Sequence, residues 1–135
     1  MRKHLNHKGQ STVEAVVILP IILLLIFGTL AVGIYIYDST VFVYAANKAL
    51  DHGIGMMIDD GYLSSSERAD IRKKAKEATG TAIFVKNITA RVSYSRKTLN
   101  INVEGDYVVN LPLIKLSKDN KDLKVKASAS FKKKR

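Results

Sequence analysis

The sequence has no cysteine and few histidines, and these absences exclude several kinds of site. Without cysteine, none of the 135 residues can supply a thiolate metal ligand, a disulfide or a cysteine nucleophile. His4 and His7 lie near the N-terminus, and His52 stands alone without a second metal ligand nearby. No nucleophile, base and orienting group recur at a motif spacing, and no glycine-rich phosphate loop follows a strand pattern. The sequence therefore predicts neither an enzyme nor a metal or cofactor site.

Acidic residues are also scarce, with 12 Asp and Glu against 22 Lys and Arg and a net charge of +10. All but one of these acids, and most of the cations, lie from Asp38 onward. The simplest interpretation is a solvated basic surface. Anionic envelope polymers, lipid headgroups and nucleic acid are the binding partners that such a charge leaves open. Roughly a hundred residues follow the apolar part of the chain, enough for one small domain.

Charge is missing altogether from the 23 residues between Glu14 and Asp38. As a helix, this run would be ~34 Å long, against a hydrocarbon thickness of ~30 Å. The basic residues before it predict an N-terminus in the cytoplasm and an exported C-terminal part. Tyr35 and Tyr37 fit aromatic anchors at the exit interface. A secretory signal peptide is the rival interpretation, but the run is longer than its usual apolar core and has no clear cleavage site.

A glycine and a glutamate at the start of this run form a specific pattern. Glu14 is the fifth residue after Gly9, with a basic leader before it and an apolar helix after it. This arrangement resembles the class III signal of type IV pilin-like proteins. The longer string KGQSTVEAVVILPIILLLIFG is similar to the opening of TadE-like proteins, the minor pilins or pseudopilins of tight-adherence (Tad, Flp) pili. The resemblance is specific over residues 8–37 and only architectural beyond them.

The resemblance implies that a prepilin peptidase cuts after Gly9 and leaves Gln10 as the first residue. Glycine, which has no Cβ, allows an extended backbone to enter a tight protease site. An unpaired Glu14 deep in the bilayer would cost ~2 to 3 kcal/mol, and the new amine of Gln10 is a suitable partner for it. In pilins this pairing joins neighbouring subunits and sets their register. We expect the amine to stay free or methylated, because cyclisation of the glutamine would remove its charge. The alternative is that Glu14 only marks the cytoplasmic edge of an ordinary anchor.

Features inside and after the span predict a long helix. Pro20 removes a hydrogen bond to the carbonyl of Val16 and should kink or loosen the helix there, although proline is also common in membrane helices. An amphipathic stripe from Phe42 onward predicts that the helix continues to about His52. Gly53 and its neighbour Gly55 are then the expected stop signals.

The remaining residues predict a short helix and a sheet. Ser64 and Glu67 form a capping box for a second helix, with Ile71 and Ala75 on its apolar face. Period-two alternation predicts three strands, each apolar on one face. The apolar positions are Ile88, Ala90, Val92 and Tyr94; Leu99, Ile101 and Val103, continued by Tyr107, Val109 and Leu111; and Leu123, Val125, Ala127, Ala129 and Phe131. Arg96-Lys97 is the expected hairpin turn, and the connection from Pro112 to Asp122 is polar.

The predicted fold class is α+β: a long membrane-spanning helix, a short helix and a small three-stranded antiparallel sheet, as in pilins. Expected divisions are a leader over 1–9, a transmembrane part over 10–37, an extracytoplasmic continuation of the helix over 38–58 and a small α+β domain over 59–135. By resemblance, the partners are a prepilin peptidase, other pilin-like subunits and the Tad assembly platform. The competing hypothesis is a single-pass anchored domain whose basic surface binds wall polymer, lipid or nucleic acid.

Overall fold

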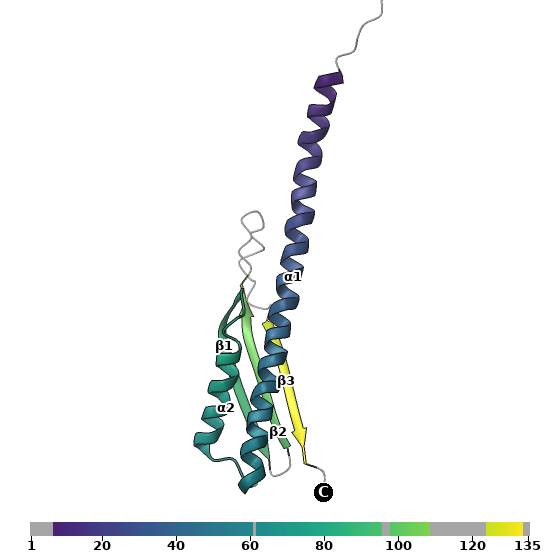
Figure 1. Ribbon diagram of the computed structural model, residues 1–135. Coiled ribbons are helices and arrows are strands. Elements are labelled where there is room, and N and C mark those ends of the chain that lie inside the picture. Colours follow the sequence, from purple (N-terminus) through teal and green to yellow (C-terminus); the bar gives the residue numbers. More distant parts are fainter. Residues whose placement is uncertain (1–6, 61, 96–97, 109–123, 134–135) are drawn as a thin grey trace, which may run out of the picture. The chain divides into compact units, whose positions relative to one another are not determined.

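The computed structural model describes residues 7–60, 62–95, 98–108 and 124–133; the side chains of residues 7–12 and 58–60 are not part of that description. The chain divides into two units, Met1–Gly33 and Ile34–Arg135. The fold is α+β, as predicted, with a long apolar helix, a short helix and a three-stranded antiparallel sheet (Figure 1). Helix α1, His7–Asp60, contributes residues to both units.

In the first unit, α1 is apolar on every side. Its described residues from Val13 to Leu30 are all exposed, and Leu24 keeps 67% of its surface accessible. The hydroxyl of Thr29 donates to the carbonyl oxygens of Leu25, at 3.0 Å, and Ile26, at 2.8 Å. These bonds satisfy the one hydroxyl in this part of the helix, which makes it compatible with an apolar surrounding.

In the second unit, α1 buries one stripe of side chains on the sheet. Phe42, Ala46 and Ala49 are almost fully buried, as the amphipathic pattern predicts. The predicted stop near His52 is wrong, because α1 continues through Gly53 and Gly55 to Asp60.

Gly53 serves close packing instead of ending the helix. It is buried, and a Cβ added there would lie 2.7 Å from Cδ2 of Leu99 and 3.1 Å from Cδ1 of Ile71. Any larger side chain would therefore push α1 away from the strand that carries Leu99 and the helix that carries Ile71. The glycine that the sequence presents as a helix stop is therefore needed for a tertiary contact.

Helix α2, Ser65–Ala78, begins at the predicted capping box. The hydroxyl of Ser64 accepts a hydrogen bond from the backbone N–H of Glu67 at 3.3 Å, and the Glu67 carboxylate accepts one from the N–H of Ser64 at 2.7 Å. Ile71 and Ala75 are fully buried, which confirms the predicted apolar face. The cap thus fixes where α2 begins, and the two apolar residues fix which face meets the core.

The sheet has the order β1-β2-β3, with both neighbouring pairs antiparallel. Its strands are β1, Val85–Ser95, β2, Thr98–Tyr107, and β3, Lys124–Lys132. The predicted alternation is confirmed in all three strands, since the odd-numbered residues Leu99, Ile101 and Val103 of β2 are fully buried and their neighbours are not. The opposite face of the sheet carries the polar side chains.

A bulge interrupts the pairing of β1 with β2 between Lys86 and Thr89. Asn87 lies in the bulge with φ 52°, and its side-chain Nδ2 donates to the Asp106 carboxylate at 3.0 Å. The left-handed conformation is one that asparagine tolerates better than most residues do.

Several predicted features lie outside the described residues. They are the turn at Arg96-Lys97, the strand positions Val109, Leu111 and Leu123, the connection from Pro112 to Asp122, and most of the leader.

Candidate functional site

The predicted cleavage site lies at the N-terminal end of α1. The helix begins at His7, so the backbone of Gly9 and Gln10 is helical. An extended conformation at this bond therefore requires the first turn of α1 to open. Few hydrogen bonds resist that opening, because the first N–H groups of a helix have no intrahelical acceptor.

Glu14 follows Gly9 by five residues in α1, and its side chain is exposed. Among the side chains that the structure describes, none forms a hydrogen bond or ion pair with it; those of residues 7–12 are not in that set. Glu14 precedes a long run of uncharged residues, so it is the last charge on this part of the helix before Asp38.

Pro20 lies inside α1, which continues as a helix on both sides of it. Its ring nitrogen has no hydrogen to donate, so the carbonyl of Val16 lacks its usual intrahelical partner. The kink that the sequence predicts at this position stays a prediction.

The apolar surface of α1 is the main feature of the first unit. Within the described residues, α1 is the one helix long and apolar enough to cross a membrane, and its most apolar part is not buried by the rest of the chain. An apolar helix that nothing covers is stable in lipid or against other apolar helices, but not in water. This helix fits single-pass anchoring in a membrane.

Asp38 performs a structural role that the sequence did not indicate. It is fully buried, and its two carboxylate oxygens accept hydrogen bonds from the backbone N–H groups of Ile83, at 2.7 Å, and Phe84, at 3.0 Å. Both acceptors are thus used, and the segment before β1 is tied to α1. Burial, followed by the nearby charge of Asp38 and by Tyr35, raises the pKa of the Tyr107 hydroxyl.

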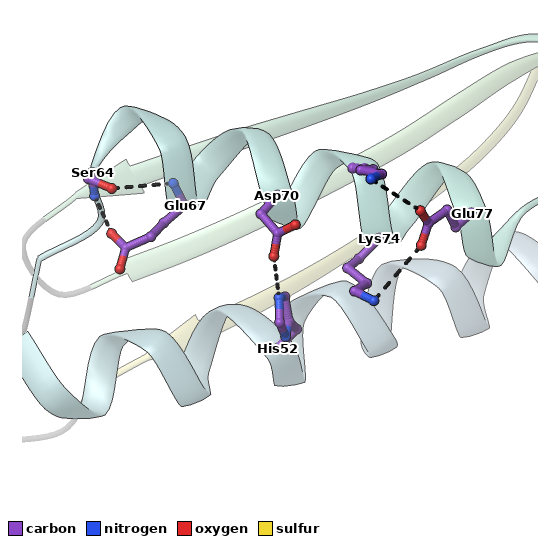
Figure 2. Close-up of polar contacts among 7 residues, drawn as sticks. His52, Ser64, Glu67, Asp70, Lys74 and Glu77 are labelled. Atoms are coloured by element: carbon purple, nitrogen blue, oxygen red, sulfur yellow. Dashed lines mark hydrogen bonds and ion pairs between the residues drawn. The ribbon is translucent and has the colours of Figure 1, made fainter.

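A second polar contact joins α1 to α2. Nε2 of His52 lies 2.8 Å from a carboxylate oxygen of Asp70, so the histidine that looked isolated in the sequence has a partner (Figure 2). This hydrogen bond, together with the charges of His52, Lys74 and Lys73, lowers the pKa of the Asp70 carboxyl. Both side chains are partly exposed, at 35% and 45%, so the pair is a modest link between helices.

The basic face of α2 forms an open groove with β1. The groove has a volume of about 590 Å³ and is lined by Ala69, Arg72, Lys73, Lys76, Glu77, Thr89 and Ala90. Nζ of Lys74 lies 3.9 Å from a carboxylate oxygen of Glu77, at the outer limit of an ion pair (Figure 2). Nζ of Lys73 lies 4.0 Å from the other carboxylate oxygen. Within the described residues, no three His, Asp or Glu side chains are grouped so that they could hold a metal ion. The three cations in the lining of the groove, Arg72, Lys73 and Lys76, against the single carboxylate of Glu77 allow the groove to attract anions.

An apolar anchor helix that continues into a small α+β domain defines a class of single-span, membrane-anchored proteins. Residues 9–51 match the family model described as TadE-like protein. The match begins at Gly9 and covers Glu14, Pro20 and the whole uncharged run, and it confirms the resemblance that the opening of the sequence carries. It extends over about a third of the chain. No curated protein and no solved structure was found to match this chain.

Proposed function

We propose that this protein is a TadE-like minor pilin, or pseudopilin, that takes part in the assembly of a Tad-type pilus for adhesion or secretion. Its role is structural and not enzymatic. A prepilin peptidase removes the leader after Gly9, and the mature chain remains in the cell membrane until it joins other pilin-like subunits. The N-terminus is cytoplasmic, and the domain from Asp38 onward is extracytoplasmic.

The observation that carries the proposal is the TadE-like match over residues 9–51, which covers the exposed apolar part of α1 and continues into the part that packs on the sheet. An ordinary anchor requires only the apolar run. The matched segment also includes Gly9 before the run and Glu14 at its entrance. A processing site and a charged contact between subunits account for both residues.

In this proposal, cleavage creates the partner of Glu14. The α-amino group freed at Gln10 is positively charged and lies one helical turn from the carboxylate, and it can also reach the glutamate of a neighbouring subunit. In lipid, an unpaired carboxylate is costly, so the pair favours one axial position of the entering subunit. The platform that extracts subunits and the ATPase that drives it are other proteins.

Intact mass measured after expression with and without a prepilin peptidase tests the processing step. We expect the mass of a chain beginning at Gln10, with a free or methylated amine, only when the peptidase is present. Gly9→Val should block cleavage, because a β-branched side chain disfavours the close approach that glycine allows. Gly28→Val is the matched control, since a Cβ at Gly28 meets no atom within 4 Å. An uncut Gly9-Gln10 bond, or loss of ammonia from every mature N-terminus, would contradict the proposal.

The registry step is tested at Glu14 by the amount of subunit that co-purifies with the pilus machinery. Glu14→Ala and Glu14→Gln should both reduce it strongly, and Glu14→Asp should retain part of it because the charge remains. If Glu14→Ala is incorporated at the wild-type level, Glu14 has no role in registry and only marks the cytoplasmic edge of an ordinary anchor.

The alternative is a membrane-anchored domain that binds an anionic ligand. The groove with Arg72, Lys73 and Lys76 favours it. In that case the protein would stay uncut in the presence of the peptidase, and the triple Gln variant of these cations would lose binding to the ligand.

A further inference from the structure

The folded domain begins at the very end of the apolar run, with no linker between them. Tyr35, inside the uncharged run, packs edge-on against Tyr107 at the end of β2, with ring centroids 5.3 Å apart and planes at 87°. Three residues further along α1, the Asp38 carboxylate accepts hydrogen bonds from the backbone N–H groups of Ile83 and Phe84. One end of the sheet is therefore packed beside residues 35–38, where the sequence predicts that α1 leaves the bilayer. We call this the Tyr107 end of the domain.

An apolar side chain is exposed at the Tyr107 end. Ile83 retains 57% of its surface, although its backbone is fixed by the Asp38 carboxylate. Apart from residues of α1, the described large hydrophobic side chains that are exposed are Ile83 and Tyr62. Tyr62 is at the other end of the domain, where it packs edge-on near Tyr94. Burial of this branched aliphatic side chain in an apolar phase would stabilise the contact, because it removes apolar surface from water.

Lysines flank the same end on the polar face of the sheet. Val85 pairs with Tyr107, and in the next row Asp106 pairs with Lys86 on one side and with Lys124 on the other. Both lysines are exposed. A single residue of strand, ~3.3 Å, separates this row from Tyr107, within the ~5 to 7 Å depth of a headgroup layer. Asp106 opposes the two cations, but two positive charges against one negative charge leave the row with a net positive charge.

We propose that the Tyr107 end of the domain rests on the outer surface of the membrane, with Ile83 in the acyl boundary and Lys86 and Lys124 bound to acidic phospholipid headgroups. This inference depends on the single-pass anchoring in the proposed function. An anionic polymer would satisfy the two lysines, but it offers nothing to Ile83. A lipid surface satisfies both, because it presents phosphates above hydrocarbon.

The contact has a consequence for the subunit before assembly. The domain is held at the bilayer by a second, reversible attachment besides the span, so its tilt is restricted. Extraction of the subunit must break this attachment, and a membrane with fewer acidic lipids releases the domain more readily.

Tryptophan fluorescence tests the proposal, because the natural chain contains no tryptophan. The full-length Ile83→Trp and Tyr62→Trp variants are reconstituted in phosphatidylcholine vesicles that contain phosphatidylglycerol, with bromine on the acyl chains as quencher. We expect strong quenching and a blue-shifted emission for Ile83→Trp and neither for Tyr62→Trp. Because tryptophan has the same affinity for interfaces at both positions, the difference reports the placement of the domain.

Headgroup preference is tested in the Ile83→Trp background with bromine on the phosphatidylglycerol alone. Each lysine near a charged surface contributes a factor of about five to the binding constant, so the Lys86→Gln/Lys124→Gln pair should weaken binding of the domain to the lipid surface about 25-fold and raise the fraction of that lipid needed for half-maximal quenching. Lys132→Gln/Lys133→Gln makes the same charge change at the other end of β3 and should have no effect.

Equal quenching of the Ile83→Trp and Tyr62→Trp variants, or an unchanged lipid preference after loss of Lys86 and Lys124, would overturn the inference. Leu24→Trp separates this outcome from failure of the anchoring itself. If Leu24→Trp is quenched and Ile83→Trp is not, the span is inserted and only the inference is wrong. If neither is quenched, both the anchoring and the inference are wrong.

Discussion

The two parts of α1 use apolar side chains in opposite ways. From Val13 to Leu30 they are exposed on every side of the helix, whereas Phe42, Ala46 and Ala49 form one stripe that is buried on the sheet. The second part is stabilised by its own chain. None of the residues that the structure describes covers the first part, so its stability depends on lipid or on other subunits. The stability of the folded domain can therefore be measured by ordinary unfolding, whereas that of the first part can be measured only with its surroundings.

The largest expected effect comes from removing a core side chain of the second part. Leu99 is fully buried next to Gly53, so Leu99→Ala should lower the free energy of unfolding of the domain by about 2 to 5 kcal/mol. Leu24→Ala, at an exposed position of the first part, should leave it unchanged. Urea unfolding in detergent micelles, followed by circular dichroism, measures both. A similar loss in the two variants would mean that the first part belongs to the same cooperative unit.

The next effect concerns the buried carboxylate. Asp38→Ala leaves the N–H groups of Ile83 and Phe84 without their acceptors and should cost about 2 to 3 kcal/mol in the same measurement. Asp51→Ala, at an exposed position of the same helix, is the control and should have almost no effect. If Asp38→Ala is as stable as Asp51→Ala, water replaces the carboxylate as the acceptor for the N–H groups of Ile83 and Phe84.

A smaller effect is expected at the start of α2. Ser64→Ala removes the capping hydroxyl and should cost about 1 kcal/mol, while Ser66→Ala, inside the first turn, should cost less. The side chain and the backbone N–H of Ser64 lower the pKa of the Glu67 carboxyl. The contribution of Glu67 is therefore complete above the ordinary pKa of ~4.3 and is lost as the pH falls through the lowered value. Unfolding curves at neutral and acid pH should show the difference between the two variants shrinking in acid.

The smallest effect is expected at the link between the helices. His52→Ala removes the hydrogen bond that lowers the pKa of Asp70, so that pKa should rise toward its ordinary value. The stability that this bond adds is lost as the pH falls through the lowered pKa of Asp70. An NMR titration of the Asp70 carboxyl carbon measures the shift, with Asn47→Ala as an exposed control on the same helix. An unchanged titration in His52→Ala would assign the lowered pKa to Lys73 and Lys74 instead.

Features set by neighbours in the sequence were predictable. The capping box needs only Ser64 and Glu67, three residues apart, and strand alternation needs only each strand's own residues, so the sequence indicates both correctly. The membrane candidate is local in the same sense, because it depends on one continuous uncharged run.

Features set by distant residues were not predictable. The sequence predicts a helix stop at Gly53 because it does not show that Leu99 packs against this glycine. It presents Asp38 only as the first charge outside the span, because the hydrogen-bond donors of Asp38 are 45 and 46 residues away. His52 looks isolated in the sequence, although Asp70 follows 18 residues later on another helix. In each case the tertiary contact overrides a local signal.

The proposed cleavage and registry site, formed by Gly9, Gln10 and Glu14, belongs neither to the features set by sequence neighbours nor to those set by distant residues. The spacing of Gly9 and Glu14 predicts the TadE-like resemblance only in combination with the basic leader, Leu19-Pro20 in the apolar run and the strand-rich tail, and the match over residues 9–51 confirms that resemblance. The roles of these residues stay predictions, because the groups they would meet, a peptidase and a neighbouring amine, belong to other molecules or exist only after cleavage.

The edges of the sheet carry a further consequence for proteins that are crowded together. Edge strands with free backbone groups tend to pair with other chains and aggregate. The bulge at Asn87 interrupts the ladder of β1, and β3 presents the exposed lysines Lys124, Lys126 and Lys132. Irregular edges and repelling charges both oppose the merging of sheets from two copies. At high local density, edge-to-edge pairing between these domains is therefore disfavoured.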